Sequence, residues 1–516
     1  MSEKDEAMFG IDLDAATERL PSRPGGEQAI SSPFSITETG TVIPTGEHDI
    51  SQNPSTRSIA VLPFKNLGPI QTNDDEFLGL GLADALITTL SNLRQLVVRP
   101  TNSVIRFTDP AQDLLIAGNE LGVDAVLDGR VQRAGERLRV TVQLVSVMDG
   151  APLWAEKFDE KWTDIFTVQD SISEQVARAL MLQLSGAEHL LLTKRETKNI
   201  DAYQSYLRGR YHWNKFTEES FQRAIACFME AIRIDPAYAL AYAGLADLYN
   251  WLGVFGVLRP ADTWGRGLRL ATRAVALDDT LAEAHAALGF ARLCFGWDWA
   301  GGERELLRAI ELNPHYATAH QWYCFQLAAE GRFAEAIAEA HLALQIDPLS
   351  PFINQALGWA YYVARDFDLS IESHRKLLEH DPDFALGYYS CARPCVQKGM
   401  HAEAIAELEK SVELSNGSPM MLAGLGHAYA SAGHERKAHD VIDKLRDLSE
   451  RRYVSPYHIT LIYCGLGELE RAFEWLGKTY AQQDAWLIWS RVEPQLDPLR
   501  ADPRFAQLLD RIGLAR

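Results

Sequence analysis

Two pairs of metal-ligand residue types stand close together in the sequence. Cys391 and Cys395 are four residues apart, so on one helix they would share a face and could bind one metal ion. His434 and His439 are five residues apart, about 140° around a helix, and cannot share a face in this way. Buried cysteines in helical proteins more often act as small hydrophobic residues. We therefore expect no metal site.

Glycine-rich and acidic stretches also fail to match known sites of phosphate chemistry. The chain contains no G-x-x-x-x-G-K-[ST] sequence, and none of its three GLG triplets continues as G-x-G-x-x-G after a strand. The acidic run at residues 74–76 suits the start of a helix, where the helix dipole favours carboxylates. No G-x-S-x-G sequence and no spacing of cysteine with histidine indicates a nucleophile. We expect no catalytic residues, no cofactor and no enzymatic activity.

Charge and composition narrow the class of partner. The 516 residues contain 50 Lys and Arg against 70 Asp and Glu, a net charge of −20, which argues against a nucleic-acid or membrane surface as the main partner. No apolar stretch is long enough to predict a membrane span, and the acidic N-terminus does not resemble a signal peptide. Six cysteines are too few for a disulfide framework, so we expect a cytoplasmic protein.

The first two segments differ sharply in composition. Residues 1–56 are rich in Ser, Thr, Pro, Gly and acidic residues and predict a disordered acidic tail. Residues 57–187 alternate strand and helix patterns: strands at 57–64 and 95–100, helices at 74–93 and 109–122, then three strands broken at Gly135 and Gly150, and a closing helix at 163–185. This segment predicts one α/β domain with a mixed sheet.

The rest of the chain repeats itself. Equivalent positions recur at separations of 43, 35 and then five times 34 residues, and 34 is the tetratricopeptide period. These positions are Pro236, Asp279, Pro314, Pro348, Pro382, Asn416, Glu450 and Asp484. Leu-Gly pairs fall where two helices must approach closely, and glycines such as Gly253 and Gly331 are expected to end the first helix of their repeats. Residues 201–484 therefore predict eight repeats, an all-α helical solenoid, with residues 485–516 as a C-terminal cap.

Two known families match these segments. Residues 201–484 resemble a tetratricopeptide repeat array. Residues 57–187 resemble the TolB-like amino-terminal domain of bacterial signalling proteins, through IAVLPFKNL at 59–67, the helix FLGLGLADALITTLSNL and the stretch 120–170. The combination is similar to the carboxy-terminal half of bacterial regulators that carry a winged-helix or adenylate-cyclase output domain. The resemblance implies a sensing and interaction half whose output is supplied by another chain, since residues 1–56 match neither output domain.

The predicted binding surface is the concave face of the solenoid, which the first helices of the repeats line. Positions expected to point into it carry aromatic residues, an arrangement typical of a binding site. We predict the partner-binding residues to be Trp213, Phe290, Phe325, Gln355, Trp359, Tyr362, Tyr389 and Arg393. Arg393 is the only cation at its repeat position, which disfavours clamping of a carboxylate. The apolar cluster at 486–489 either caps the array or folds back into the groove.

These patterns predict a non-enzymatic interaction scaffold of bacterial signalling or transcriptional regulation that binds a protein or peptide segment in the repeat groove. One alternative is a regulator that senses a small ligand through the TolB-like domain and acts on a separate cyclase or transcription factor. A degenerate enzyme and a direct DNA binder are further alternatives, disfavoured by the missing catalytic motifs and by the charge. The oligomeric state stays open.

Overall fold

The computed structural model describes most of the chain beyond residue 56. The described residues are 34–36, 42–44, 57–67, 73–108, 113–161, 165–182, 184–192, 194, 196–215 and 218–515. Side chains are not described at 34–36, 42–44, 73–77, 187, 190–191 and 218. Strands β1 (Phe34–Ile36) and β2 (Val42–Pro44) form an antiparallel pair. The rest of the predicted acidic tail, residues 1–56, lies outside the described residues, so its disorder stays a prediction.

The α/β part is built on a mixed sheet, as the sequence predicts. Its strand order is β5-β3-β6-β7-β8, and the short β4 pairs with β6. β3 runs parallel to both β5 and β6, whereas β6, β7 and β8 follow one another antiparallel. The strands are β3 Arg57–Val61, β4 Lys65–Asn66, β5 Leu96–Val98, β6 Ala125–Ala134, β7 Arg137–Ser146 and β8 Pro152–Lys161.

The two predicted turns join the long antiparallel strands. Gly135 (φ 61°) links β6 to β7, and Gly150 (φ 70°) lies between β7 and β8. A left-handed φ at these positions is what glycine allows without a steric cost. Along β7, buried Leu138, Val140 and Val142 alternate with exposed residues, which shows that β7 is covered on one face, whereas residues 125–129 of β6 are buried on both.

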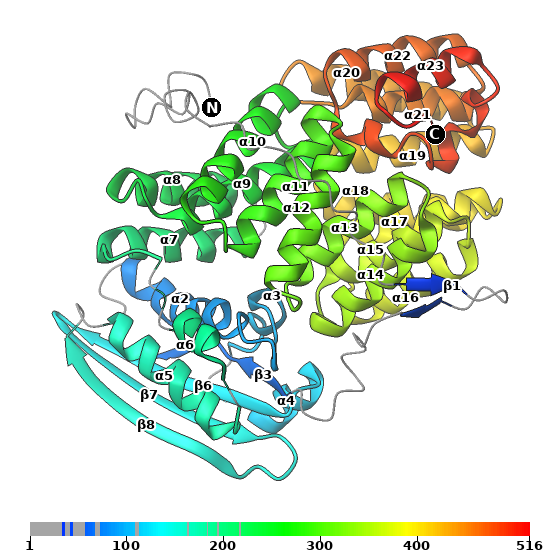
Figure 1. Ribbon diagram of the computed structural model, residues 1–516. Helices are drawn as coiled ribbons and strands as arrows, with labels where there is room; N and C mark the ends of the chain where they lie inside the picture. The colour runs from blue at the N-terminus through cyan, green and yellow to red at the C-terminus, as the bar shows by residue number, and fades with distance from the viewer. Residues whose placement is uncertain are drawn as a thin grey trace.

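Five helices belong to this α/β part. They are α2 Asn73–Leu90, α3 Thr101–Val104, α4 Leu114–Leu121, α5 Ile165–Ala179 and α6 Gly186–Leu192. Helix α4 begins where the Asp113 carboxylate accepts hydrogen bonds from the backbone N–H of residues 115 and 116, and it ends at left-handed Gly122. Its expected start near Pro110 lies outside the described residues. In Figure 1, α2, α5 and α6 lie between the sheet and the repeat helices.

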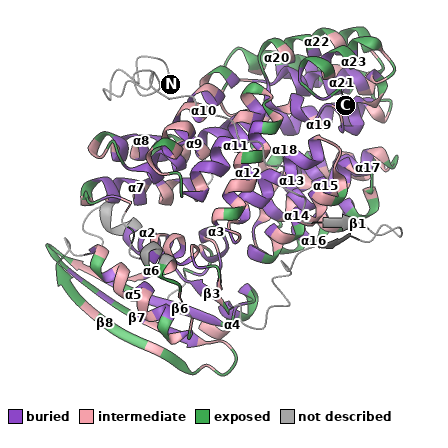
Figure 2. Ribbon diagram, viewed as in Figure 1, coloured by how far each residue is buried: buried purple, intermediate pink, exposed green. Residues whose placement is uncertain are grey.

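Residues 200–481 form eight consecutive antiparallel helix pairs, described except at 216 and 217. The pairs are α7 Ile200–Trp213 with α8 Glu218–Ile234, α9 Ala239–Val254 with α10 Pro260–Leu277, α11 Ala282–Gly296 with α12 Trp299–Leu312, α13 Ala317–Ala329 with α14 Phe333–Ile346, α15 Pro351–Val363 with α16 Phe367–His380, α17 Ala385–Gln397 with α18 His401–Leu414, α19 Pro419–Ser431 with α20 Glu435–Ser449, and α21 Pro456–Leu466 with α22 Leu469–Ala481. The number of repeats agrees with the sequence prediction. Figure 2 shows buried residues along the inner helices and exposed ones on β8 and α20.

The periodic residues found in the sequence have a structural role. In four repeats, a side chain in the first turn of the first helix hydrogen-bonds the backbone carbonyl six residues earlier. The pairs are His285 with Asp279, His320 with Pro314, Asn354 with Pro348 and Tyr388 with Pro382. His285 and His320 also contact the carboxylates of Glu305 and Glu339 on the second helix of the same repeat. The period therefore marks a repeated connection between the loop and the first helix, which two histidines extend to the second helix.

Close helix packing explains the Leu-Gly pairs. A Cβ atom on Gly358 would lie 2.5 Å from the imidazole of His374, and one on Gly289 would lie 2.8 Å from Leu306. Such distances exclude any side chain, so glycine sets the helix spacing there. Gly331 follows its helix with φ 80°, as expected. Gly253 differs from the expectation, because it lies inside the longer α9 and packs against Trp264.

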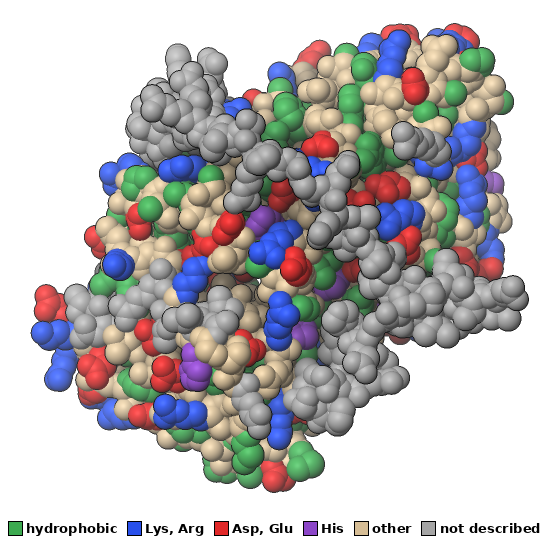
Figure 3. Space-filling model, viewed as in Figure 1, with side chains coloured by type: hydrophobic (Ala, Val, Ile, Leu, Met, Phe, Trp, Pro, Cys, Tyr) green, Lys and Arg blue, Asp and Glu red, His purple; other side chains and the backbone are tan. Residues whose placement is uncertain are grey.

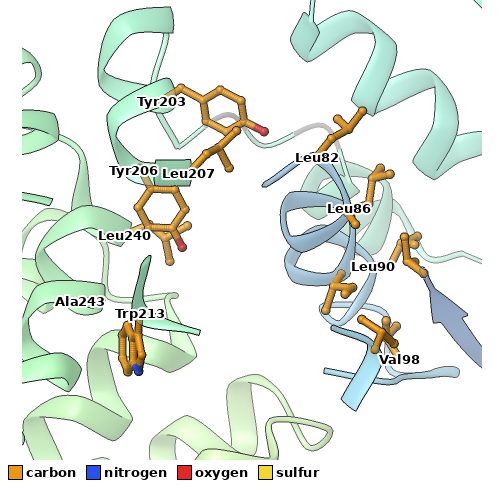
Figure 4. Packing of buried hydrophobic residues seen from close by; sticks show 14 of the residues in the cluster. Leu82, Leu86, Leu90, Val98, Tyr203, Tyr206, Leu207, Trp213, Leu240 and Ala243 are labelled. Carbon is orange, nitrogen blue, oxygen red and sulfur yellow. The ribbon is translucent and has the colours of Figure 1, made fainter. Parts of the chain in front are cut away.

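The α/β part packs directly on the first repeats. One hydrophobic cluster runs from β3 through α2 and α7 to α11. Figure 4 shows side chains of this cluster on both helices: Leu82, Leu86 and Leu90 on α2, and Tyr203, Tyr206 and Leu207 on α7. The helices approach closely at Gly81, where a Cβ atom would lie 3.1 Å from Leu207. Within this contact the Asp84 carboxylate accepts two hydrogen bonds from Arg210, both at 3.0 Å. The two parts therefore share a core.

A single arginine also joins the α/β part to the fourth repeat. The Arg99 guanidinium donates to the carbonyls of Leu121 and Gly122, at the end of α4, and to those of Gln345 and Ile346, at the end of α14. The C-terminal end of a helix carries partial negative charge and carbonyls without partners. One buried cation therefore stabilises two helix ends that lie far apart in the sequence.

Candidate interaction site

The C-terminal segment, defined here as residues 485–499, folds back onto the first helices of the repeats. It forms two 3-10 helices, η2 (Ala485–Trp489) and η3 (Pro494–Leu499), and is followed by α23 (Pro503–Arg511). Helix η2 lies against α9, α11 and α13, and η3 lies against α21. These four helices are first helices of their pairs, so the segment occupies the face that the sequence predicts as a groove; we call it the concave face.

Trp489 is the main apolar contact of the segment. Its ring is 5.8 Å from that of Phe325 and 5.4 Å from that of Trp359, both in edge-to-face geometry. Its indole Nε1 donates to the Phe325 carbonyl at 3.4 Å. Phe325 and Trp359 themselves pack edge to face at 5.0 Å. Two predicted groove aromatics and one residue of the segment thus form a single aromatic cluster.

Glu493 is the polar contact of the segment. Its carboxylate pairs with the buried guanidinium of Arg393 and accepts a hydrogen bond from the Tyr362 hydroxyl at 2.6 Å. The Arg393 guanidinium lies over the ring of Tyr362, 4.4 Å from its centroid, and near that of Tyr389 at 5.6 Å. Burial by itself lowers the pKa of Arg393, but Glu493 together with the surrounding tyrosines outweighs it and the pKa is raised. Arg393 is thus fully charged and paired.

The carboxylate that Arg393 binds here is a side chain, that of Glu493. The expectation that its position disfavours clamping of a partner's carboxyl terminus stays a prediction. Two tyrosines complete the contact: Tyr362 donates its hydroxyl to Glu493, and the ring of Tyr389 lies near the guanidinium. A charge-assisted pair with a second donor is a strong contact at a buried position.

Further contacts hold the edges of the segment. Arg365 forms two hydrogen bonds of 2.7 Å with Asp497 at the exposed rim. Burial lowers the pKa of His427 to about 3, so its neutral ring accepts a hydrogen bond from the Gln495 amide at 3.0 Å. The indole of Trp486 donates to the carbonyl of Val254 at 3.0 Å. Both ends of the segment are therefore attached to the array.

The structure brings six of the eight predicted groove residues together. Phe325, Gln355, Trp359, Tyr389 and Arg393 line one small apolar cavity of about 40 Å³, which Trp486 and Trp489 cover. Tyr362 joins them through Glu493. Gln355 donates to the Ser390 hydroxyl at 3.1 Å. Whether these residues bind a partner stays a prediction, since the chain's own segment covers them here.

Two predicted groove residues lie elsewhere. Phe290 is fully buried and stacks on Trp322 at 4.0 Å, so it packs between repeats. Trp213 packs edge to face on Phe228 at 6.3 Å, at the end of α7. The register of the first repeat explains this difference, because α7 begins at residue 200, five residues earlier than extrapolation from the later repeats places it.

Sequence reasoning missed Glu493 and the inward position of Trp251. Glu493 lies outside the repeats, and nothing in its neighbourhood distinguishes it from other acidic residues. Trp251 stacks on Phe255 and packs against Trp322 and Phe352, at the bottom of the concave face. Its position one turn after Asp247, a predicted groove position, was the available signal.

The residues first considered for chemistry have packing roles. Cys391 and Cys395 are both buried on α17 and carry free thiols. His434 precedes α20, and His439 pairs with Glu468 at 3.0 Å. No group of three or more His, Cys, Asp or Glu side chains among the described residues could hold a metal ion. In the GLG triplet of α2, a Cβ on the third residue, Gly81, would lie 3.1 Å from Leu207, so this triplet allows close packing on α7.

The exposed surface carries mixed charge. Figure 3 shows Lys and Arg side chains interspersed with Asp and Glu on the face it displays, without one large patch of either sign. Across the parts of the chain that the structure covers, no helix is both long and apolar enough to cross a membrane. The predicted cytoplasmic location and the absence of a nucleic-acid partner stay predictions.

Comparison with known proteins links both parts of the chain to regulators. Residues 55–175 match the family model of the HilA/YgeH-like transcriptional regulator, second domain. The chain is 22% identical over 451 residues to the transcriptional regulator HilA of Salmonella typhimurium, across 87% of this chain and 79% of HilA. It is 32% identical over 244 residues to a protein of Rhizobium meliloti named putative adenylate cyclase 3, across 46% of this chain. This chain covers 41% of that relative's length.

Solved structures with related helical repeats overlap only in part. Human IFIT1 bound to a capped RNA covers 61% of this chain and 76% of its own, with a TM-score of 0.43 and 14% identity. A tetratricopeptide repeat protein of Thermus thermophilus covers 37% of this chain and 99% of its own, with a TM-score of 0.32 and 19% identity. These scores are too low to carry a functional argument for this chain.

The match to the HilA-type domain and the similarity to HilA agree with a regulatory role, and the eight helix pairs agree with a tetratricopeptide-type helical region. The comparisons match the α/β part to a HilA-type domain, so its TolB-like resemblance stays a prediction. The absence of enzymatic activity also stays a prediction, because one relative is named a putative adenylate cyclase.

Proposed function

We propose that this chain is a non-enzymatic regulatory module that binds a segment of a partner protein on its concave face, in exchange with its own C-terminal segment. The observation that carries the proposal is the contact set around Trp489 and Glu493: one aromatic side chain in an aromatic cluster and one carboxylate on a buried arginine. Most of the binding energy of a peptide groove comes from a few such buried anchors.

The contacts define the chemistry of the partner segment. It would place an aromatic residue against Phe325 and Trp359 and a carboxylate four residues later on Arg393, as Trp489 and Glu493 do. Each helix pair also has contacts of its own, such as the hydrogen bond of 2.7 Å from the Ser370 hydroxyl on α16 to the Gly358 carbonyl on α15. The similarity to transcriptional regulators supports the regulatory part of the proposal.

A synthetic peptide with the sequence of residues 485–499 tests the proposal in the full chain. We expect the double variant Trp489→Ala/Glu493→Gln, which weakens the internal contacts, to bind the labelled peptide, and the wild-type chain to bind it at least tenfold more weakly. A peptide with Gln at the position of Glu493 should lose binding to the opened variant. Adding Arg393→Met to that variant should abolish binding, whereas adding Arg504→Met, at an exposed ion pair with Glu470, should not.

Two results would overturn the proposal. One is equal binding of the peptide to the wild-type chain and to the opened variant. The other is equal binding of the Glu and Gln peptides. Once the opened variant is shown to bind, capture from a native lysate with and without Arg393→Met identifies the partner, and circular dichroism checks that each variant is folded.

A further inference from the structure

A second cavity lies between the α/β part and the array, apart from the C-terminal segment. Its volume is about 130 Å³, and it is lined by α2 and α3 on one side and by α7, α9, α11 and the start of α13 on the other. Trp251, Gln321 and Phe352 separate it from the apolar cavity under Trp489. Unlike that cavity, it is lined by many polar residues as well as apolar ones.

Carboxylates dominate the charge of this lining. Three acidic residues line the cavity: Asp247, Glu283 and Asp347. Among its described lining residues, Arg210 is the only one that is a lysine or an arginine. Arg210 donates two hydrogen bonds to Asp84, and its charge also lowers the pKa of Asp247 and of Glu283, against the larger effect of burial. Neither Asp247 nor Glu283 forms an ion pair with a described residue, and one carboxylate oxygen of Asp247 is buried without a hydrogen bond.

A buried histidine adds an acceptor without a partner. His315 is 7% exposed and lines the cavity. Its Nε2 contacts the Arg94 carbonyl at 3.0 Å and must therefore donate, which leaves Nδ1 as an acceptor. Nδ1 makes no hydrogen bond in the described structure. Buried acceptors without a donor are rare in folded proteins because they lose their hydration without replacement.

Aromatic residues form a further part of the lining. Trp213, Trp251, Tyr316 and Phe352 contribute rings to the cavity wall. Aromatic rings attract cations through their negative faces, and the attraction is strongest where water is excluded. Acceptors, carboxylates and aromatic rings together favour a ligand that donates hydrogen bonds and carries a positive charge.

We propose that this cavity binds a small organic cation, an aliphatic ammonium ion, with its charged group between Asp247 and Glu283 and its N–H groups donating to Asp247 and to His315. The site uses residues of the array for charge and residues of the α/β part for its other wall. It is independent of the concave-face proposal, because it needs neither Trp489 nor Glu493.

Calorimetric titration of the full chain with butylammonium, 1-butanol and butyrate tests this site. We expect butylammonium to bind and the alcohol and the anion to bind at least tenfold more weakly, a comparison that needs no variant. Asp247→Asn and Glu283→Gln keep the shape of the side chains and should each weaken butylammonium binding at least tenfold. Glu470→Gln, at an exposed carboxylate on α22, is the matched control and should bind like wild type.

Three results would overturn the inference. The first is no binding of butylammonium at millimolar concentration to the wild-type chain. The second is equal binding of butylammonium and 1-butanol, which would mean that the cavity takes apolar molecules without regard to charge. The third is unchanged binding in both folded carboxylate variants, which would place the ammonium ion elsewhere.

Discussion

Replacing Glu493 by glutamine tests how the C-terminal segment is held. The side chain is 1% exposed and pairs with Arg393, which is 4% exposed. Glutamine keeps the shape but leaves the guanidinium charge without a counter-charge, and removal of one partner of a buried pair costs about 3–5 kcal/mol. Release of the segment would let water reach Arg393, so we expect the cost to appear as local opening of residues 485–499.

Hydrogen–deuterium exchange read by mass spectrometry measures this opening. A cost of that size predicts exchange roughly 10²- to 10⁴-fold faster in peptides from residues 485–499, with little change in α13 or α15. The matched control is Asp497→Asn, because the Arg365–Asp497 pair is exposed and worth about 0.2–1 kcal/mol. The double variant Arg393→Met/Glu493→Leu should exchange more slowly than Glu493→Gln, since it leaves no unpaired charge.

One outcome would refute this reasoning. If Glu493→Gln exchanges no faster than Asp497→Asn in the segment, the buried ion pair does not hold it. The apolar contacts of Trp489 would then be sufficient, and Trp489→Ala, for which a cost of about 3–5 kcal/mol is expected, would become the perturbation of choice.

Three further predictions concern the connection between the parts and the buried titratable groups. Arg99→Met removes the donor to two helix ends, so we expect its urea unfolding curve to split from one transition into two. The α/β part should lose about 2–4 kcal/mol of unfolding free energy. Arg94→Met, which loses one exposed hydrogen bond, is the control and should retain one transition. Burial lowers the pKa of His320, but its hydrogen bond and charge interaction with Glu339 outweigh burial, and the pKa is raised. Protonated His320 therefore stabilises the folded chain fully below about pH 6.5, and this stabilisation is lost as the pH rises through the pKa of the folded state. His320→Gln should therefore lose more unfolding free energy at pH 6 than at pH 9, and equal losses would contradict this. Burial raises the pKa of Asp247 to about 7, against the charge of Arg210, so the wild-type chain loses stability from about pH 4 up through pH 7. The Asp247→Asn variant should be about 1–3 kcal/mol more stable than wild type at pH 8.5, and this difference should shrink toward pH 4. Urea unfolding at both pH values measures the difference.

The repeats were predictable because each repeats the same local signals. Glycines at close helix contacts, such as Gly358, and residues at the loop positions recur every 34 residues, and the structure places each pair of helices accordingly. In the α/β part, the turns at Gly135 and Gly150 were predictable because a left-handed φ restricts the residue type. The helix pairs and the two turns were predictable because each depends on residues close together in the sequence.

That the C-terminal segment covers the concave face was not predictable in the same way. The contact of Glu493 with Arg393 spans 100 residues, and no period or motif connects the two. The prediction for Trp213 failed because α7, α8 and the connection between them are together longer than in the later repeats, and a five-residue error turns a helical side chain by about 140°. The cavity between the two parts depends on Arg99 and Asp84, whose partners lie in the repeats.

Because a chain is synthesised from its N-terminus, Arg393 is made before the Glu493 that covers it. Arg393 emerges 100 residues before Glu493, and at about 5–20 residues per second translation takes roughly 5–20 s to cover that distance. Helix pairs form far faster than this, on the scale of microseconds to milliseconds. Every newly made molecule therefore passes through a period of seconds in which the helix pair that carries Arg393 has formed and this arginine still meets water, before Glu493 arrives to cover it.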